Sequence, residues 1–329
     1  MAVYNQSIAR ATGSDALVPE PLAVQIIEEL PKKSAALSLM RKTTMSTKTE
    51  RMPVLDVLPT SYFVGTGQDT GLKQTTDMAW KNVTLVVEEI ATIVPIPEAY
   101  MADADVPIWS EVRPRLTEAV GQLIDGAVFW GINRPSTWGM DIYSSATASG
   151  NYIKDGFLDG AGGEPADDFG QSVTALGDLM AQTGYTLNGF AARPGINWRL
   201  MGIRSAQGIP IYQPDMQNGS GGSLYGYDLN QVDNGSWQSS KAQVIGGDWS
   251  KAIIGVRQDL TFKMFSEGVI SDGNGVVILN LMQQDAVAMR LTMRMAYAVA
   301  NPVTILQPND TIDGAGATTM RFPFGYIAS

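Results

Sequence analysis

Hydrophobic and polar residues alternate without a break from residue 287 to residue 299. One face of this segment carries Val287, Met289, Leu291, Met293, Met295, Tyr297 and Val299. The other face carries alanine, threonine and two arginines, Arg290 and Arg294. Thirteen residues at about 3.3 Å each span about 43 Å, whereas most strands have about five or six residues. The pattern predicts an unusually long strand, which suits an extended structural body.

Apolar residues at helical spacing predict three amphipathic helices. The first covers residues 19–30 and ends at Pro31, the second covers 110–132, and the third begins at Phe169 and runs through Met180. Ser110 is expected to cap the second helix, in which Pro114 is tolerable because it lies near the start. A shorter helix is expected over residues 196–206.

Other segments predict strands and turns. Residues 52–97 predict a long hairpin with a polar, glycine-rich tip, and residues 189–194 and 241–265 are strand-like. The tetrapeptide at 272–275, Asp-Gly-Asn-Gly, predicts a tight turn. Residues 214–240 read as a long surface loop because they are rich in glycine, serine, asparagine and aspartate. Interspersed helices and antiparallel strands indicate an α+β fold.

Composition excludes several kinds of chemistry. The 329 residues include no cysteine and no histidine, which removes thiol nucleophiles, Cys/His zinc sites, Ser-His-Asp relays and disulfides. The glycine-rich tracts lack the context of a nucleotide-binding loop, and the acidic loop at 155–168 lacks EF-hand spacing, so neither a cofactor nor a metal is expected. No signal peptide and no membrane-spanning run of about 18 apolar residues occurs.

Charge is distributed unevenly along the chain. The net charge of -10 argues against a protein that coats nucleic acid. Residues 32–51 nevertheless carry a local balance of +5, and residues 52–105 carry -6. Adjacent blocks of opposite sign suggest electrostatic docking between copies, although solvated faces without a specific role are the alternative. The polar basic tract and a two-stranded hairpin both need a surface to pack on, which implies a neighbour.

The order of these segments resembles the major capsid proteins of tailed bacteriophages, with the Hong Kong 97-type fold. The resemblance spans residues 19 to about 306 and rests on the following tracts in order: WKNVTLVVEEIATIVPIPEAYMADA, ARPGINWRLMGIRSAQGIPIY, SLYGYDL, VIGGDWSKAIIGVR and QDAVAMRLTMRMAYAVANPVTI. The combination of GDWSKAIIGVR with the later RLTMRMAYAVANP is its most specific part.

The resemblance implies a division of the chain. Residues 1–50 would form an N-terminal arm and residues 51–97 an extended hairpin loop. Residues 98–135 and 258–329 would form a peripheral domain with the long helix and the long strand, and residues 136–257 an axial domain. The protein would have no enzymatic activity, would be made in the host bacterial cytoplasm and would reside in the virion.

The resemblance also implies partners. Copies would form hexamers and pentamers that tile an icosahedral shell around double-stranded DNA, with DNA held only by non-specific proximity. Portal and decoration proteins are further expected partners, no membrane is involved, and a separate scaffolding protein is expected because no long scaffolding segment precedes the arm. Contacts between subunits are expected at Lys32, Lys33, Arg41, Lys42, Asp69, Lys73, Asp77, Trp80, Glu88, Glu89, Arg290 and Arg294.

Two other functions remain open at this point. Encapsulins, the shells of bacterial nanocompartments, use the same fold to enclose an enzyme. A hydrolase based on carboxylates such as Glu88, Glu89 or Glu98 is a distant alternative, since nothing in the sequence pairs them across a cleft. Some relatives crosslink a hairpin lysine to an asparagine of a neighbour, for which Lys73 and Asn301 are the candidates.

Overall fold

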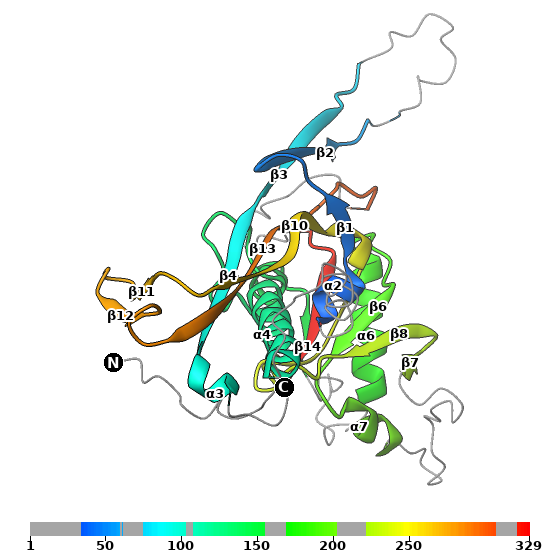
Figure 1. Cartoon of the computed structure of the whole chain (residues 1–329). Coiled ribbons are helices and arrows are strands. Elements are labelled where there is room, and N and C mark those ends of the chain that lie inside the picture. The colour runs from blue at the N-terminus through cyan, green and yellow to red at the C-terminus, as the bar shows by residue number, and fades with distance from the viewer. Residues whose placement is uncertain are drawn as a thin grey trace, which may run out of the picture.

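The computed structural model describes residues 34–59, 61, 75–102, 108–154, 169–202, 222–306 and 321–329. Within these residues the chain forms a four-stranded sheet, a six-stranded sheet and two separate hairpins, with helices packed against the sheets (Figure 1). This arrangement confirms the predicted α+β class. The helix predicted over 19–30, the hairpin tip at 62–74 and the acidic loop at 155–168 lie outside the described residues.

The long strand is the centre of the four-stranded sheet. Strand β13, Ala286–Val299, has 14 residues and pairs antiparallel with β10, Ala252–Phe265, on one side and with β4, Glu88–Pro97, on the other. Strand β1, Arg41–Thr44, pairs parallel with the outer side of β10. The predicted alternation of buried and less buried residues is confirmed for β13. Strand β10, which begins within the GDWSKAIIGVR motif, and strand β13 lie in the segments where the sequence predicts them.

The two faces of β13 have different surroundings. Met289, Leu291, Met293 and Met295 are buried in one core cluster with Val112, Leu116, Val120 and Ile124 of helix α4, Ile108–Trp130. On the opposite face Arg290, Thr292 and Arg294 are only partly buried, whereas the alanines at both ends of the strand are buried.

Helix α4 begins at Ile108, two residues before the predicted start. Ser110 therefore lies inside the helix, and the cap predicted there is wrong.

The second sheet has the strand order β5-β14-β9-β6-β8-β7. Its strands are β5, Tyr152–Ile153, β14, Phe324–Ala328, β9, Ala242–Gly247, β6, Gly189–Ala192, β8, Tyr227–Gln231, and β7, Gly222–Leu224. Helix α6, Phe169–Gln182, packs on this sheet through Val173 and Leu176, which confirms the predicted helix. Helices α5, Ile142–Ala148, and α7, Ile196–Gly202, complete this part of the chain.

The long loop expected over 214–240 is wrong for residues 222–231, whereas residues 232–240 form no helix or strand. Residues 222–231 form the β7–β8 hairpin, whose turn has positive φ angles at Tyr225 and Gly226. Leu224 and Leu229 bury their side chains in the core of the six-stranded sheet. Two well-spaced leucines therefore outweigh a composition that is typical of loops.

Two segments lie elsewhere than the expected division of the chain places them. Strand β4 belongs to the four-stranded sheet through its pairing with β13, although residues 51–97 were expected to form the hairpin loop. Strand β14 was not predicted, and it lies between β5 and β9 in the six-stranded sheet, whereas β10 and β13 belong to the four-stranded sheet. Pairing partners distant in sequence decide both placements.

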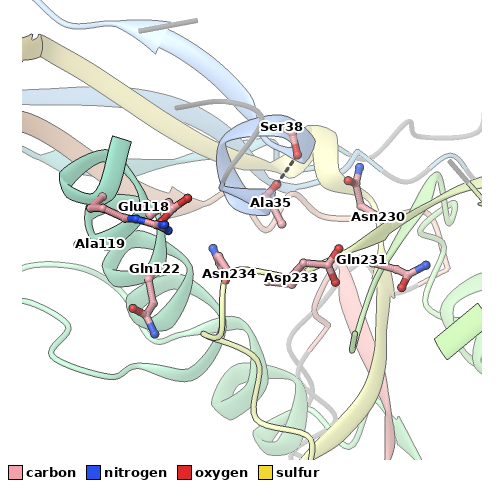
Figure 2. A pocket seen from close by; sticks show the side chains of 11 residues that line it. Ala35, Ser38, Glu118, Ala119, Gln122, Asn230, Gln231, Asp233 and Asn234 are labelled. Carbon is pink, nitrogen blue, oxygen red and sulfur yellow. Dashed lines mark hydrogen bonds and ion pairs between the residues drawn. The ribbon is translucent and has the colours of Figure 1, made fainter. Parts of the chain in front are cut away.

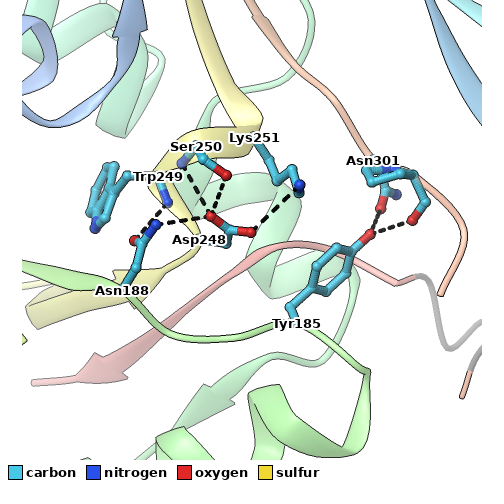
Figure 3. Close-up of polar contacts among 8 residues, drawn as sticks. Tyr185, Asn188, Asp248, Trp249, Ser250, Lys251 and Asn301 are labelled. Atoms are coloured by element: carbon cyan, nitrogen blue, oxygen red, sulfur yellow. Dashed lines mark hydrogen bonds and ion pairs between the residues drawn. The ribbon is translucent and has the colours of Figure 1, made fainter. Parts of the chain in front are cut away.

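A short connection joins the two sheets. Strand β9 passes through a 3₁₀ turn, Trp249–Lys251, directly into β10. Asp248 caps this turn, accepting hydrogen bonds from the Ser250 amide at 3.1 Å and from Asn188 Nδ2 at 2.9 Å (Figure 3). The Trp249 amide donates in turn to Asn188 Oδ1 at 3.0 Å. These bonds explain why GDWSK forms a fixed corner between the sheets.

Candidate subunit interface

The hairpin formed by β2, Thr49–Val57, and β3, Ala79–Val86, extends away from both sheets (Figure 1). Its base is anchored on its own chain, where Leu85 and Val87 pack with Ala296, Ala298 and other residues in a small core cluster. Farther from the base most side chains are exposed to solvent, and Trp80 is 63% exposed. The predicted hairpin is confirmed for its strands within residues 49–86 but not for residues 88–97, and its base needs no neighbouring subunit.

Residues from the end of the chain also hold the hairpin base. The Val303 amide donates to the Leu55 carbonyl at 3.0 Å, and Arg321 lies 3.6 Å from the Asp56 carboxylate. The Arg321 side chain is almost fully buried. Burial limits the screening of the guanidinium charge by solvent, whereas the Asp56 side chain is 39% exposed, so this contact links a buried cation at the end of the chain to the base of the hairpin.

A second hairpin projects from the other end of the long strand. It consists of β11, Val269–Ser271, and β12, Val277–Asn280, joined by the predicted turn, in which Gly275 has φ of +82°. Inner residues such as Ile270 and Leu279 pack against buried Ala286 and Ala288. The outer side chains are exposed and apolar: Val269, Val276, Val277, Ile278 and Met282. Soluble monomers rarely expose such a patch, so it marks an interaction surface.

The outer face of the four-stranded sheet is the face opposite α4. The two hairpins cover its ends and leave its middle uncovered. Arg290 and Arg294 of β13 lie there, and Lys263 of β10 is opposite Arg290 in the strand register. Ile93 of β4 pairs with Arg290 from the other side and is 46% exposed. The result is a basic strip, partly apolar, bounded at both ends by hairpins.

Several charges expected to contact a neighbour already have partners in their own chain. Arg294 donates to Glu89 Oε2 from Nε at 2.8 Å and from Nη2 at 2.6 Å, as cross-strand neighbours do. Glu88 accepts from Thr137 Oγ1 at 2.7 Å. Arg290 stacks over the Phe265 ring at 4.9 Å. Contacts of Glu88, Glu89 and Arg294 with a second subunit stay a prediction, which these partners within the chain do not test.

The remaining predicted contact residues fall into two groups. Arg41, Lys42, Asp77 and Trp80 are exposed, the first two on the edge strand β1 and the others at the outer part of the hairpin. Lys32, Lys33, Asp69 and Lys73 lie outside the described residues. The exposed apolar hairpin and Lys263 were missed by sequence reasoning, although the run VVIL after the turn carried a signal of apolar residues in a two-stranded element.

The basic tract at 32–51 was expected to pack on a neighbour, and the structure corrects this for residues 34–37, 40 and 45, which are buried within their own chain. Helix α2, Ala35–Leu39, buries Ala35, Ala36 and Leu37 against its own chain, and Met45 is buried beside the hairpin base. Helix α3, Glu98–Ala102, follows β4 and buries none of its residues. Small apolar residues between the basic ones account for the docking of α2.

Asp125 of α4 joins three segments and was also missed. Its carboxylate accepts hydrogen bonds from Ser34 Oγ at 2.7 Å, from the Ala35 and Ala36 amides at 3.0 Å each, and from Asn234 Nδ2 at 2.6 Å. Burial raises the pKa of Asp125 above its ordinary value, while these four hydrogen bonds oppose the rise. A single acidic residue within the apolar run LIDGAVFW was the available signal.

Neither a metal site nor a crosslinking site is supported among the described residues. They contain no group of three acidic side chains placed to hold a metal ion, and no described helix has the length and apolar character needed to cross a bilayer. The Asn301 side chain is engaged in its own chain. Its Oδ1 accepts from the Tyr185 hydroxyl at 2.6 Å (Figure 3), and its Nδ2 donates to the Arg321 carbonyl. Lys73, the other candidate for the crosslink, lies outside the described residues, so the crosslink stays a prediction.

Solved bacteriophage structures share this architecture. The structure from Microbacterium phage Oxtober96 is 32% identical, with 90% of each chain covered and a TM-score of 0.74. The structure from Mycobacterium phage Cain is 30% identical, with the same coverage and TM-score. Among curated relatives, the major capsid protein of Staphylococcus phage 80alpha is 24% identical over 296 residues, which cover 87% of this chain and 83% of that protein.

These similarities confirm the Hong Kong 97-type capsid fold. The model of the phage capsid family matches residues 15–307, so the chain belongs to the phage capsid family. It is a major capsid protein of a bacteriophage, a structural component of the virion that assembles into a multimeric shell.

The geometry at Asp125 leads to the first prediction. Replacement Asp125→Asn keeps the size of the side chain but turns an NH₂ group toward groups that all donate hydrogen bonds. We expect a loss of about 1–3 kcal/mol in the free energy of unfolding, because buried donors lose their acceptor. Urea denaturation measures the loss, and hydrogen exchange should show faster exchange of the α2 amides.

The matched control is Asp178→Asn, the same change at an exposed position of α6 where the carboxylate accepts from Gln182. It should alter the free energy of unfolding by no more than about 0.5 kcal/mol. Equal effects of the two substitutions would show that Asp125 does not hold α2 in place.

Proposed function

We propose that the subunit assembles as hexamers and pentamers into an icosahedral shell that encloses double-stranded DNA. The observation that carries the proposal is the exposed apolar surface of the two projecting hairpins, at Trp80 and around Val277, which a neighbouring subunit would cover. Family membership supports a shell of many copies. The chain would be made in the host cytoplasm and would have no catalytic role.

The proposed contact uses charge as well as shape. The hairpin over residues 49–86 carries Glu50, Asp56, Asp69 and Asp77 against Arg51, Lys73 and Lys81, a balance of -1, and the open middle of the outer sheet face carries Lys263 and Arg290. A neighbour's hairpin, including Asp69 and Asp77, would lie across this strip, and Arg41 and Lys42 on edge strand β1 would extend it. Complementary charges of this kind set the partner and the register more than the affinity.

Other partners follow from the same proposal. A separate scaffolding protein would assist assembly, and a portal protein and decoration proteins would be further partners of the shell. DNA would be enclosed by proximity alone, because the net charge of -10 disfavours tight adhesion to the wall. An encapsulin-type shell would instead hold a protein cargo, so the content of the particle distinguishes the two.

Electron microscopy of the expressed chain, alone and with its scaffolding protein, tests the proposal. Closed shells with five-fold and six-fold capsomers are expected, and sedimentation should place the protein in megadalton particles or capsomers. A population that stays monomeric or dimeric under both conditions and at high concentration would refute the proposed assembly.

Charge reversal at the sheet strip provides a more specific prediction. Lys263→Glu should reduce the yield of shells at least about tenfold at low salt. A loss of about 1.4 kcal/mol per contact lowers the association constant of that contact tenfold. Salt near 0.5 M should restore part of the yield by screening the repulsion. The control is Lys154→Glu at an exposed lysine after β5, which should assemble normally. A normal yield from Lys263→Glu at low salt would exclude this strip from the interface.

The apolar hairpin gives a separate prediction. Val277→Asp should leave the unfolding free energy of the isolated subunit within about 0.5 kcal/mol, because the side chain is exposed. Shell formation measured by sedimentation should nevertheless be lost, since a charge would enter an apolar contact. The control is Ser271→Asp, which places the same charge at the polar residue that pairs with Val277 across the hairpin. Shell formation should tolerate this substitution better. If both variants assemble equally well, this hairpin does not contact a neighbour.

A further inference from the structure

An asparagine followed by a glycine is a chemically reactive pair. The glycine nitrogen can attack the side-chain carbonyl carbon of the asparagine, and the missing Cβ atom of glycine leaves room for the approach. A C–N bond closes a five-membered succinimide ring, the bond from Cγ to Nδ2 breaks, and ammonia leaves with the proton of the attacking nitrogen. Water then opens the ring to aspartate or isoaspartate. Three such pairs lie within the described residues: Asn188–Gly189, Asn234–Gly235 and Asn274–Gly275.

The fold engages the side chains of two of these asparagines. Asn188 Nδ2 donates to Asp248 Oδ1 at 2.9 Å, and its Oδ1 accepts from a backbone amide at 3.0 Å (Figure 3). Asn234 lies on the wall of a pocket between α2 and α4 (Figure 2), where its Nδ2 donates to the buried Asp125 at 2.6 Å. Attack on either side chain would require these hydrogen bonds to break.

Asn274 differs because its side chain is exposed at the turn of the β11–β12 hairpin, and no described group is hydrogen-bonded to its side-chain amide. Neither Gly273 nor Asn274 has a positive φ angle, whereas Gly275 has φ of +82°. The Gly275 amide donates to the Asp272 carbonyl at 3.0 Å. These features define a type I turn followed by a left-handed residue, a common form of hairpin loop.

The turn keeps the attacking nitrogen away from its target. A type I turn holds the ψ angle of its third residue, here Asn274, near 0°. Ring closure requires the Gly275 nitrogen to eclipse Cβ about the Cα–C bond, and at this ψ the two atoms are about 120° apart. The Asp272 carboxylate stabilises the turn, because its Oδ1 accepts from the Asn274 amide at 2.9 Å and from the Val276 amide at 2.8 Å. It thus restrains the backbone on both sides of the reactive bond.

We propose that Asn274 is the site at which the folded subunit deamidates, and that Asp272 controls the rate by holding the turn closed. The reaction needs no partner besides water, and it proceeds when the turn opens. Its product places a new negative charge beside the exposed Val276 and Val277, and isoaspartate also adds one methylene group to the backbone of the turn. The inference concerns the isolated subunit and does not require the shell to form as proposed.

Peptide mapping of the full, unassembled chain by mass spectrometry tests the inference, because replacing NH₂ by OH changes the peptide mass. In mildly alkaline buffer the folded protein should convert Asn274 before Asn188 or Asn234. Asp272→Ala should speed conversion of Asn274 at least about tenfold, because two hydrogen bonds to a charged acceptor are lost. The matched control is Asp228→Ala, the same change at an exposed position of the β7–β8 hairpin, which should leave the rate unchanged.

Measurements in urea separate the effect of the fold from that of the local sequence. In the unfolded chain all three pairs should react at similar rates, and Asp272→Ala should have no effect. In the folded chain Asp272→Ser should give an intermediate rate, because a hydroxyl accepts the same hydrogen bonds more weakly.

Three results would overturn the inference. Conversion of Asn188 or Asn234 before Asn274 in the folded protein would exclude Asn274 as the preferred site. A rate for Asp272→Ala no faster than that of the Asp228→Ala control would exclude the role of Asp272. An equal acceleration by Asp272→Ala in urea would show that the aspartate acts through the local sequence and not through the turn.

Discussion

The fold depends on one strand that is longer than the core beneath it. Strand β13 pairs along most of its 14 residues with β10 and β4, and its inner methionines and leucine pack on α4. Toward the ends of its outer face, alanines replace the arginines of the middle, and each set of alanines lies under a hairpin. Short side chains at 286, 288, 296 and 298 allow these hairpins to approach closely. The spacing of alanine and arginine along one strand thus decides which parts of the outer face are covered by its own chain.

Asp125 adds a polar constraint to this apolar framework. A buried carboxylate is costly unless it accepts enough hydrogen bonds, and here two backbone amides, a hydroxyl and a side-chain amide supply them. The arrangement fixes the start of α2 relative to α4 and to the segment after β8. An apolar residue at this position would pack, but it would leave the amides at the start of α2 without acceptors.

Much of the framework could be predicted because it depends on local periodicity. The alternation at 287–299, the helical spacing from Phe169 to Met180 and the turn before β12 each depend on residues close in sequence. Strands β4 and β14 were misplaced or missed because distant partners determine their positions. The hairpin base was assigned to a neighbour for the same reason: Leu85 and Val87 look unpaired until Ala296 and Ala298 are brought beside them. Similarly, no local pattern could show that Glu89 and Arg294 would pair across 205 positions.

The geometry of β13 gives the subunit a directional stiffness. Hydrogen bonds to β10 and β4 run perpendicular to the strand, so tension along its axis would load many of them at once, in shear. The β11–β12 hairpin, pulled apart at its open end, would instead yield one bond after another. The subunit therefore resists stretching along the axis of β13, whereas its projecting β11–β12 hairpin can bend. The direction of the strands within a single chain already determines this mechanical anisotropy.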